Sequence, residues 1–344
     1  MSRLSTSIIG RTWDEWRHRR LQSGGDTEDF LLVTWDSCRH DTFERARTPV
    51  LDGHAAARRA WAMATYTLPA HQAMFNGFLP HVFEPLPFYN RYVQQLWRIS
   101  HRNVAVKPLV TFPEGTVNIV NGFRRRGYAT LGVAAMDWFK RPSPLQDGFE
   151  WFRVTGTRAR TQVEMLREQI TRRARHRPCF VFANFGETHS PFRHEGMAVG
   201  ADPQGERMSL GRLFNASGLH DATATIDTDL WARQVACAEF LDAQMADLLR
   251  CFMARGRPTT VVVTADHGEC LGEQGLYGHA IHHEKVLEVP LLIFRLNAPP
   301  HAAPETNAEK PSAGPHGAGR AGVAAAIPDY SITSMSASTQ ERSN

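Results

Sequence analysis

Short apolar runs rich in β-branched and aromatic residues recur along the chain and alternate with longer amphipathic stretches. The runs that fit buried strands are residues 30–35, 129–134, 179–185, 259–264 and 290–295. Between 228 and 255 the apolar positions recur instead with helical spacing, and Gly256 ends that pattern just before the next strand. This alternation predicts an α/β fold with a mostly parallel central sheet flanked by helices on both faces.

The composition indicates one globular domain with poorly structured ends. The chain has 344 residues, of which 42% are hydrophobic and 22% are charged, which is enough to build a sizeable core. We expect a polar, arginine-rich extension over 1–27, a single domain over 28–297, and a disordered tail over 298–344, whose Pro, Ala, Gly and Ser cannot form a core. Residues 194–226 are rich in Gly, Asn and Asp and are expected to form a long loop over a cleft.

Charge and cysteine usage narrow the class of protein. The formal net charge is only +4, and the basic runs at 124–126 and 172–177 lack the interleaved aromatics of a nucleic-acid surface, so we expect solvated helix faces there. The five cysteines form no CxxC pair and are odd in number, which favours a reducing compartment. Neither a signal-peptide pattern nor an apolar segment of membrane-spanning length is visible. These features predict a cytoplasmic protein without a membrane or nucleic-acid partner, and they leave its oligomeric state open.

Acidic and imidazole side chains follow the ends of two predicted strands. The run 259–264 leads into Asp266 and His267, and the run 30–35 leads into Asp36. Because the carboxyl ends of parallel strands lie at one edge of a sheet, we expect these three side chains to meet. Two carboxylates and an imidazole suit a divalent ion, with zinc or manganese favoured and calcium still open. The alternative for Asp-His-Gly taken alone is an ordinary turn after a strand.

A hydroxyl group stands at the start of another apolar segment, residues 65–80. Thr67 precedes Pro69, which predicts a helix with Thr67 as its N-cap and Pro69 in the first turn. The threonine oxygen would then face unpaired amides and the positive end of the helix dipole. Beside a bound cation such a hydroxyl can become a nucleophile. The alternative is that Thr67 only caps the helix.

Taken together, these segments resemble the alkaline phosphatase superfamily, in particular its sulfatase and phosphodiesterase branch. The likeness covers residues 29–296 in order, and it includes TPVLD (48–52), GFRRRGYATLGV (122–133), ETHSPF (187–192), TADHGECLGEQGLYGHA (264–280) and HHEKVLEVPLLIF (282–294). The resemblance implies that 28–297 is a sulfatase-like catalytic domain. It also implies a metal ion held by Asp36, Thr67, Asp266 and His267.

The segment TLPAH (67–71) departs from the sulfatases in this branch. Their catalytic Cys or Ser becomes formylglycine, which threonine cannot form. The segment instead resembles the Thr-Phe-Pro-Asn-His of nucleotide pyrophosphatase/phosphodiesterases, with Leu68 and Ala70 as the differences. The resemblance therefore implies attack by Thr67 on phosphorus. Ser37 stands where the calcium sulfatases have a second acid, which makes calcium less favoured.

Two histidines complete the expected site. His189 and His279 match family residues that contact the transferred group, and in two-metal members the second position ligates another ion. Glu187 could join them, but the Asp-then-His pattern of two-metal members is missing, so one ion is expected and a second stays open. The predicted activity is hydrolysis of a small anionic phosphate, phosphodiester or phosphonate ester through a covalent threonine intermediate. The alternatives are a phosphoryl or phosphoethanolamine-type transferase, a sulfatase-like hydrolase, and a non-catalytic binding protein with the same fold.

Overall fold

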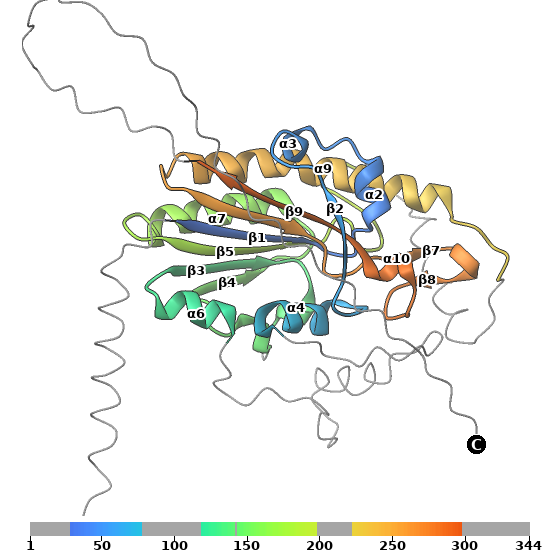
Figure 1. Cartoon of the computed structure of the whole chain (residues 1–344), viewed down its shortest axis with the longest axis horizontal. Helices are drawn as coiled ribbons and strands as arrows, with labels where there is room; N and C mark the ends of the chain where they lie inside the picture. Colours follow the sequence, from blue (N-terminus) through green and yellow to red (C-terminus); the bar gives the residue numbers. More distant parts are fainter. Residues whose placement is uncertain (1–27, 78–117, 142, 198–221, 298–344) are drawn as a thin grey trace, which may run out of the picture. The chain divides into compact units, whose positions relative to one another are not determined.

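The computed structural model describes residues 28–77, 118–141, 143–197 and 222–297, which belong to one compact unit. Its centre is a seven-stranded sheet with the strand order β2-β9-β6-β1-β5-β3-β4 (Figure 1). The strands are β1 (Asp29–Trp35), β2 (Arg58–Trp61), β3 (Ala129–Ala134), β4 (Trp151–Val154), β5 (Cys179–Phe185), β6 (Thr259–Thr264) and β9 (Glu288–Leu296). The strands β6, β1, β5, β3 and β4 are parallel, and β9 runs antiparallel to both β6 and β2. The predicted mostly parallel α/β sheet is confirmed.

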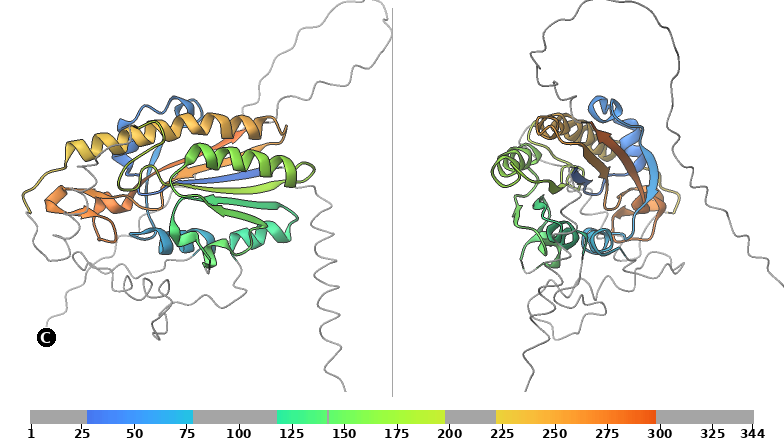
Figure 2. Two further views of the ribbon diagram at one scale, coloured as in Figure 1. Left: turned by 180° about the vertical axis from the view of Figure 1, so that it is seen from behind. Right: turned by 60° about the vertical axis from the view of Figure 1, so that its left-hand side comes forward.

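Helices cover both faces of the sheet (Figure 2). They are α2 (His40–Arg45), α3 (Pro49–Asp52), α4 (Thr67–Asn76), α6 (Ile119–Arg125), α7 (Ala159–Arg173), α9 (Thr228–Met253) and α10 (Glu284–Leu287). Side chains alternate between the faces of a strand, so Leu31 and Val33 of β1 join the core under α7 and α9. Phe30 and Leu32 face the other way, into an aromatic-rich core under α4 and α6.

Three predicted strands, 129–134, 179–185 and 259–264, match the observed strands in full. The other two, predicted over 30–35 and 290–295, are observed as 29–35 and 288–296, so they extend one or two residues further at their ends. The helix predicted over 228–255 ends at Met253. The strands β2 and β4 were not predicted. Both lie at the edges of the sheet and have only four residues, so neither has the apolar run of a central strand.

Several sequence predictions fall outside the described residues. These are the extension over 1–27, the tail over 298–344 and the part of the 194–226 loop between 198 and 221. Residues 194–197 and 222–226 are irregular, as predicted. Among the helices in the described ranges, none has both the length and the apolarity required to span a bilayer.

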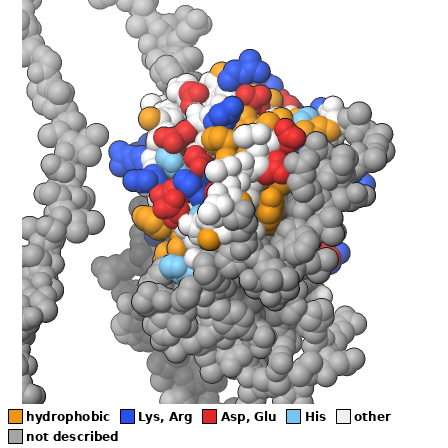
Figure 3. Space-filling view, turned by 90° about the vertical axis from the view of Figure 1, so that its right-hand side faces the viewer, with side chains coloured by type: hydrophobic (Ala, Val, Ile, Leu, Met, Phe, Trp, Pro, Cys, Tyr) orange, Lys and Arg blue, Asp and Glu red, His pale blue; other side chains and the backbone are white. Residues whose placement is uncertain are grey.

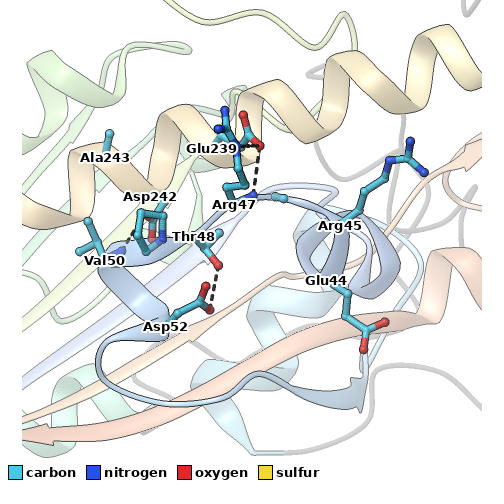
Figure 4. A pocket seen from close by; sticks show the side chains of 11 residues that line it. Glu44, Arg45, Arg47, Thr48, Val50, Asp52, Glu239, Asp242 and Ala243 are labelled. Atoms are coloured by element: carbon cyan, nitrogen blue, oxygen red, sulfur yellow. Dashed lines mark hydrogen bonds and ion pairs between the residues drawn. The ribbon is translucent and has the colours of Figure 1, made fainter.

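A groove of about 700 Å³ lies between the α2–α3 segment and α9, and both charged and apolar side chains line it (Figure 4). Beside it, the Asp242 carboxylate of α9 accepts hydrogen bonds from the backbone amides of Val50 and Leu51, both at 3.0 Å. Thr48 Oγ1 donates to Asp52 Oδ1 at 3.0 Å. These contacts attach the TPVLD segment to α9, so its polar residues serve the packing of α3.

Candidate metal centre and active site

The candidate site lies where the carboxyl ends of three neighbouring strands meet. The central strand β1 is followed by Asp36, β6 by Asp266 and His267, and β5 by the loop that contains His189. A separate ribbon of β7 (Cys270–Leu271) and β8 (Tyr277–Gly278), together with α10, lies at this edge of the sheet (Figure 1). Viewed from that side, described acidic, basic and histidine side chains intermingle on the surface (Figure 3).

One ligand atom from each of Asp36, Asp266 and His267 lies within 4.8 Å of the other two, and all three residues are fully buried. His267 Nε2 is 3.5 Å from Asp266 Oδ2 and 3.9 Å from Asp36 Oδ1. Ligands that sit 2.0–2.2 Å from a tetrahedral ion are about 3.4 Å from one another. The spacing of these atoms is thus close to that of a coordination shell.

The hydroxyl of Thr67 supplies a fourth oxygen at the same spacing. Its Oγ1 is 3.5 Å from Asp36 Oδ2 and 3.4 Å from His267 Nε2. The predicted N-cap position of Thr67 is wrong by one residue, because Tyr66 is the N-cap and Thr67 is the first residue of α4. The hydroxyl faces a carboxylate and an imidazole rather than the amides of the helix, so Thr67 does not cap the helix through its side chain.

The electrostatics of this cluster call for a cation. Asp266 Oδ2 is buried and has no hydrogen-bond partner among the described residues. Burial raises the pKa of Asp266 to about 6. Burial and the neighbouring Asp266 carboxylate also raise the pKa of Asp36. Two adjacent buried carboxylates are costly without a compensating positive charge, so the donor set fits a divalent ion.

His267 has the protonation state that a metal ligand needs. Burial lowers its pKa to about 3, so the ring is neutral. Its Nδ1 lies 2.9 Å from the carbonyl oxygen of Gly268, and since a carbonyl only accepts, Nδ1 carries the proton. The lone pair is therefore on Nε2, the atom that faces Asp36, Asp266 and Thr67.

The two predicted substrate-contacting histidines lie beside this cluster. The ring of His279 is 4.6 Å from that of His267 and 5.2 Å from that of His189. Glu187 is not part of the group. Its Oε1 accepts a hydrogen bond from the amide of Ala159 at the start of α7, at 2.7 Å. In the described ranges no second set of three close metal-ligating side chains accompanies the first, so the geometry there offers one ion site.

A family model described as Sulfatase matches residues 28–313, which is most of the 344-residue chain. This chain belongs to the sulfatase family. No curated protein sequence matches it.

Solved structures with a similar fold include periplasmic domains. The C-terminal periplasmic domain of the phosphoethanolamine transferase EptC from Campylobacter jejuni has a TM-score of 0.52 at 12% identity, with 78% of this chain and 80% of that chain covered. The corresponding EptC domain from Escherichia coli, in complex with Zn, gives 0.50 at 14%, with 79% and 74% covered. YidJ from Bacteroides fragilis, a candidate sulfatase, gives 0.53 at 14%, with 78% and 68% covered. These likenesses confirm the sulfatase-like fold.

The predicted cytoplasmic location is corrected by the same comparisons. Both EptC domains are periplasmic, which points away from the cytoplasm. The prediction was inferred from unpaired cysteines and from signals that were not seen. All five cysteines are indeed free, but an unpaired thiol packs in a core in any compartment. Cys38 and Cys270, which flank the metal ligands, are buried, and burial raises the pKa of both thiols, so they remain neutral packing groups.

The candidate site is supported by Asn184 and Thr34, which the sequence analysis did not identify, and by His71, the last residue of the TLPAH segment, to which it gave no role. Asn184, within β5, donates to Asp36 Oδ2 at 3.1 Å and to Thr34 Oγ1 at 3.2 Å. Thr34 in turn contacts His71 Nε2 at 3.1 Å, and His71 Nδ1 donates to the carbonyl of Thr67 at 2.8 Å. Burial lowers the pKa of His71 to about 4, which keeps the ring neutral. A continuous series of hydrogen bonds thus connects the sheet to the backbone of Thr67.

Arg39 is a second group that the sequence did not assign. It is buried and pairs with Asp41 at 2.7 Å and with Glu273 at 2.5 Å. Through these pairs it joins the loop after β1 to the glycine-rich loop after β6. Gly268 lies between Arg39 and the backbone of Lys285. A Cβ at this position would be 3.4 Å from Cγ of Arg39 and only 2.1 Å from the carbonyl oxygen of Lys285. The glycine of the Asp-His-Gly motif therefore permits a close backbone approach.

Proposed function

We propose that this sulfatase-family protein is a metal-dependent enzyme that cleaves phosphate, phosphodiester or phosphonate esters through covalent attack by Thr67. The observation that carries the proposal is the position of Thr67 Oγ1, 3.4 Å from His267 Nε2 and 3.5 Å from Asp36 Oδ2. A threonine hydroxyl at this place is suited to attack a phosphorus centre, whereas the formylglycine that sulfatases use cannot form from threonine. Cleavage of sulfate esters on this site is therefore the less favoured alternative.

The residues present fit a metal ion, as the unpaired Asp266 Oδ2 and the spacing of the donor atoms indicate. Asp36, Asp266, His267 and Thr67 would hold it, with zinc or manganese favoured by two carboxylates and one imidazole. When bound, such an ion acidifies the hydroxyl and offsets negative charge on the ester. The same completeness of the donor set disfavours a non-catalytic binding protein.

The remaining steps follow from the protein's own groups. Thr67 Oγ1 forms a bond to phosphorus, the bond to the leaving oxygen breaks, and the hydroxyl proton passes to Asp36 Oδ2, to which Oγ1 already donates. His189 and His279 contact the nonbridging oxygens and the leaving oxygen, where negative charge develops. Water then attacks phosphorus, the bond from phosphorus to Thr67 Oγ1 breaks, and the proton held by Asp36 returns to Oγ1.

Transfer is the second candidate, because two proteins of similar fold are named phosphoethanolamine transferases. In that case an alcohol or amine takes the place of water in the second step. Adding candidate acceptors to the assay and following transferred product separates the two outcomes.

The test of the proposal is an activity panel on purified protein whose bound metal has been measured by elemental analysis. Aryl phosphate, phosphodiester, phosphonate and sulfate esters would be compared after loading with zinc, manganese or calcium. We expect bound metal at about one ion per chain and a preference for phosphorus over sulfur. A preparation that turns over only the sulfate ester would refute the proposal.

A further inference from the structure

The β7–β8 ribbon brings a buried carboxylate to one of the predicted substrate-contacting histidines. Cys270 pairs with Gly278 across the ribbon. Glu269 directly precedes Cys270, and His279 directly follows Gly278, so the two residues stand opposite each other at the open end of the ribbon. His279 Nδ1 is 3.1 Å from Glu269 Oε1 and 3.2 Å from Oε2.

Both partners are held firmly. The side chain of Glu269 is fully buried, and that of His279 is 18% exposed. The carbonyl oxygen of Glu269 accepts a hydrogen bond from Arg39 Nη1 at 3.4 Å. On the other side, the amide of Ala280 donates to the carbonyl oxygen of Thr65 at 2.7 Å, two residues before Thr67. The pair is thus fixed between the metal motif and the segment that leads to the nucleophile.

We propose that Glu269 is a positioning residue, which fixes the ring orientation and tautomer of His279. An ionised carboxylate only accepts hydrogen bonds, so Nδ1 of His279 carries a proton and the ring is oriented with Nε2 toward the ester; a second proton, on Nε2, is the one that this nitrogen donates to an ester oxygen. The inference rests on the proposed function, since it assigns Glu269 a part in binding the same transferred group.

The position of Glu269 favours this role over that of a metal ligand. The close group of metal-ligating atoms contains Asp36, Asp266 and His267 but not Glu269, although Glu269 lies only two residues beyond His267. Its carboxylate instead engages the imidazole with both oxygens. A buried carboxylate that orients a histidine through the far ring nitrogen is a general way of fixing which nitrogen faces a reactant.

The experiment compares Glu269→Ala, Glu269→Gln, His279→Gln and the double variant Glu269→Ala/His279→Gln in the zinc-loaded protein. We expect Glu269→Ala to lower kcat/KM by about 10- to 100-fold without loss of zinc. Glu269→Gln should lose less, because its amide oxygen still accepts from Nδ1. If Glu269 acts through His279, the double variant should be no slower than His279→Gln alone. The control is Glu284→Gln, the same change at an exposed carboxylate in α10, which should keep wild-type kcat/KM.

A readout independent of turnover is the tautomer of His279, observed by long-range ¹H–¹⁵N NMR and assigned from its absence in His279→Gln. We expect the Nδ1-protonated form in the wild type and its loss in Glu269→Ala. Loss of zinc in Glu269→Gln, additive losses in the double variant, or an unchanged tautomer in Glu269→Ala would each overturn the inference. If no phosphorus ester is turned over, the proposed function fails, and the tautomer measurement still decides whether Glu269 orients His279.

Discussion

Replacement of Glu187 by Gln should change the pH dependence of stability in a way that the structure specifies. The carboxyl of Glu187 is buried beside the first turn of α7, and its Oε2 has no hydrogen-bond partner among the described residues. Burial raises its pKa from the ordinary 4.5 to about 7. An acid whose pKa is higher in the folded state stabilises the protein below its unfolded pKa. That contribution is lost as the pH rises through the folded pKa.

The size of the effect follows from the two pKa values of Glu187. A shift from 4.5 to about 7 corresponds to about 3 kcal/mol of folding free energy, lost between about pH 4.5 and pH 7. Glutamine keeps an oxygen that accepts from the amide of Ala159, but its NH2 group brings two N–H donors to the place where the neutral acid has one O–H. The extra donor lowers the stability of Glu187→Gln by the same amount at every pH, so we expect its stability relative to wild type to rise by about 3 kcal/mol between pH 4.5 and pH 8.

The assay is urea unfolding of wild type and Glu187→Gln from pH 4.5 to pH 8 at fixed zinc, with the free energies extrapolated to water. Titration of all other groups cancels in the difference between the two proteins. Glu164→Gln, the same change at an exposed position of α7, serves as the control and should give a flat difference. A flat difference for Glu187→Gln as well would refute the argument that this carboxyl is destabilised by burial.

Three further predictions concern the metal, the nucleophile and the tail. Asp266→Ala or His267→Ala should remove metal and activity together; full metal occupancy in either variant, measured by elemental analysis, would place the ion elsewhere. Thr67→Ala should keep its metal and lose at least ~10²-fold in rate, Thr67→Ser should retain part of it, and acid quench should leave phosphothreonine detectable by peptide mass. Normal turnover by Thr67→Ala would rule out the covalent step. Deletion of 298–344 should leave the melting temperature and turnover unchanged, because this composition lacks a core, and a large drop in melting temperature would show that the tail packs on the domain.

The sequence was most informative about the site where an acidic or imidazole side chain directly follows a buried strand. Asp36, Asp266 and His267 could be predicted to meet because each follows a strand with a clear apolar run, and parallel strands bring their carboxyl ends to a common edge. That the three atoms lie within 4.8 Å of one another is a result of the structure alone.

His71 stands in the TLPAH segment that the sequence analysis singled out, but the contacts of the supporting residues could not be predicted, for a physical reason. Asn184 lies inside an apolar strand and His71 inside a helix, and each has its function through partners that are distant in the sequence. Strand register and helix docking decide those contacts, and neither leaves a local pattern. Glu269 did carry a signal, since it belongs to Asp-His-Gly-Glu, but its partner His279 is set by the pairing of the β7–β8 ribbon.

The hydrogen bonds from Asn184 through Thr34 and His71 to Thr67 have a consequence for how this domain can vary. Thr34 belongs to β1, the middle strand of the sheet, so Thr67, the proposed nucleophile, is anchored to the central strand of the domain. The β7–β8 ribbon and the other described loops at this edge of the sheet do not carry the proposed attacking atom, Thr67 Oγ1. Insertions, deletions or exchanges in those segments can therefore alter which ester or acceptor enters while the point of attack stays in place. Substrate specificity can therefore change in this domain without a change in the position of the reactive group.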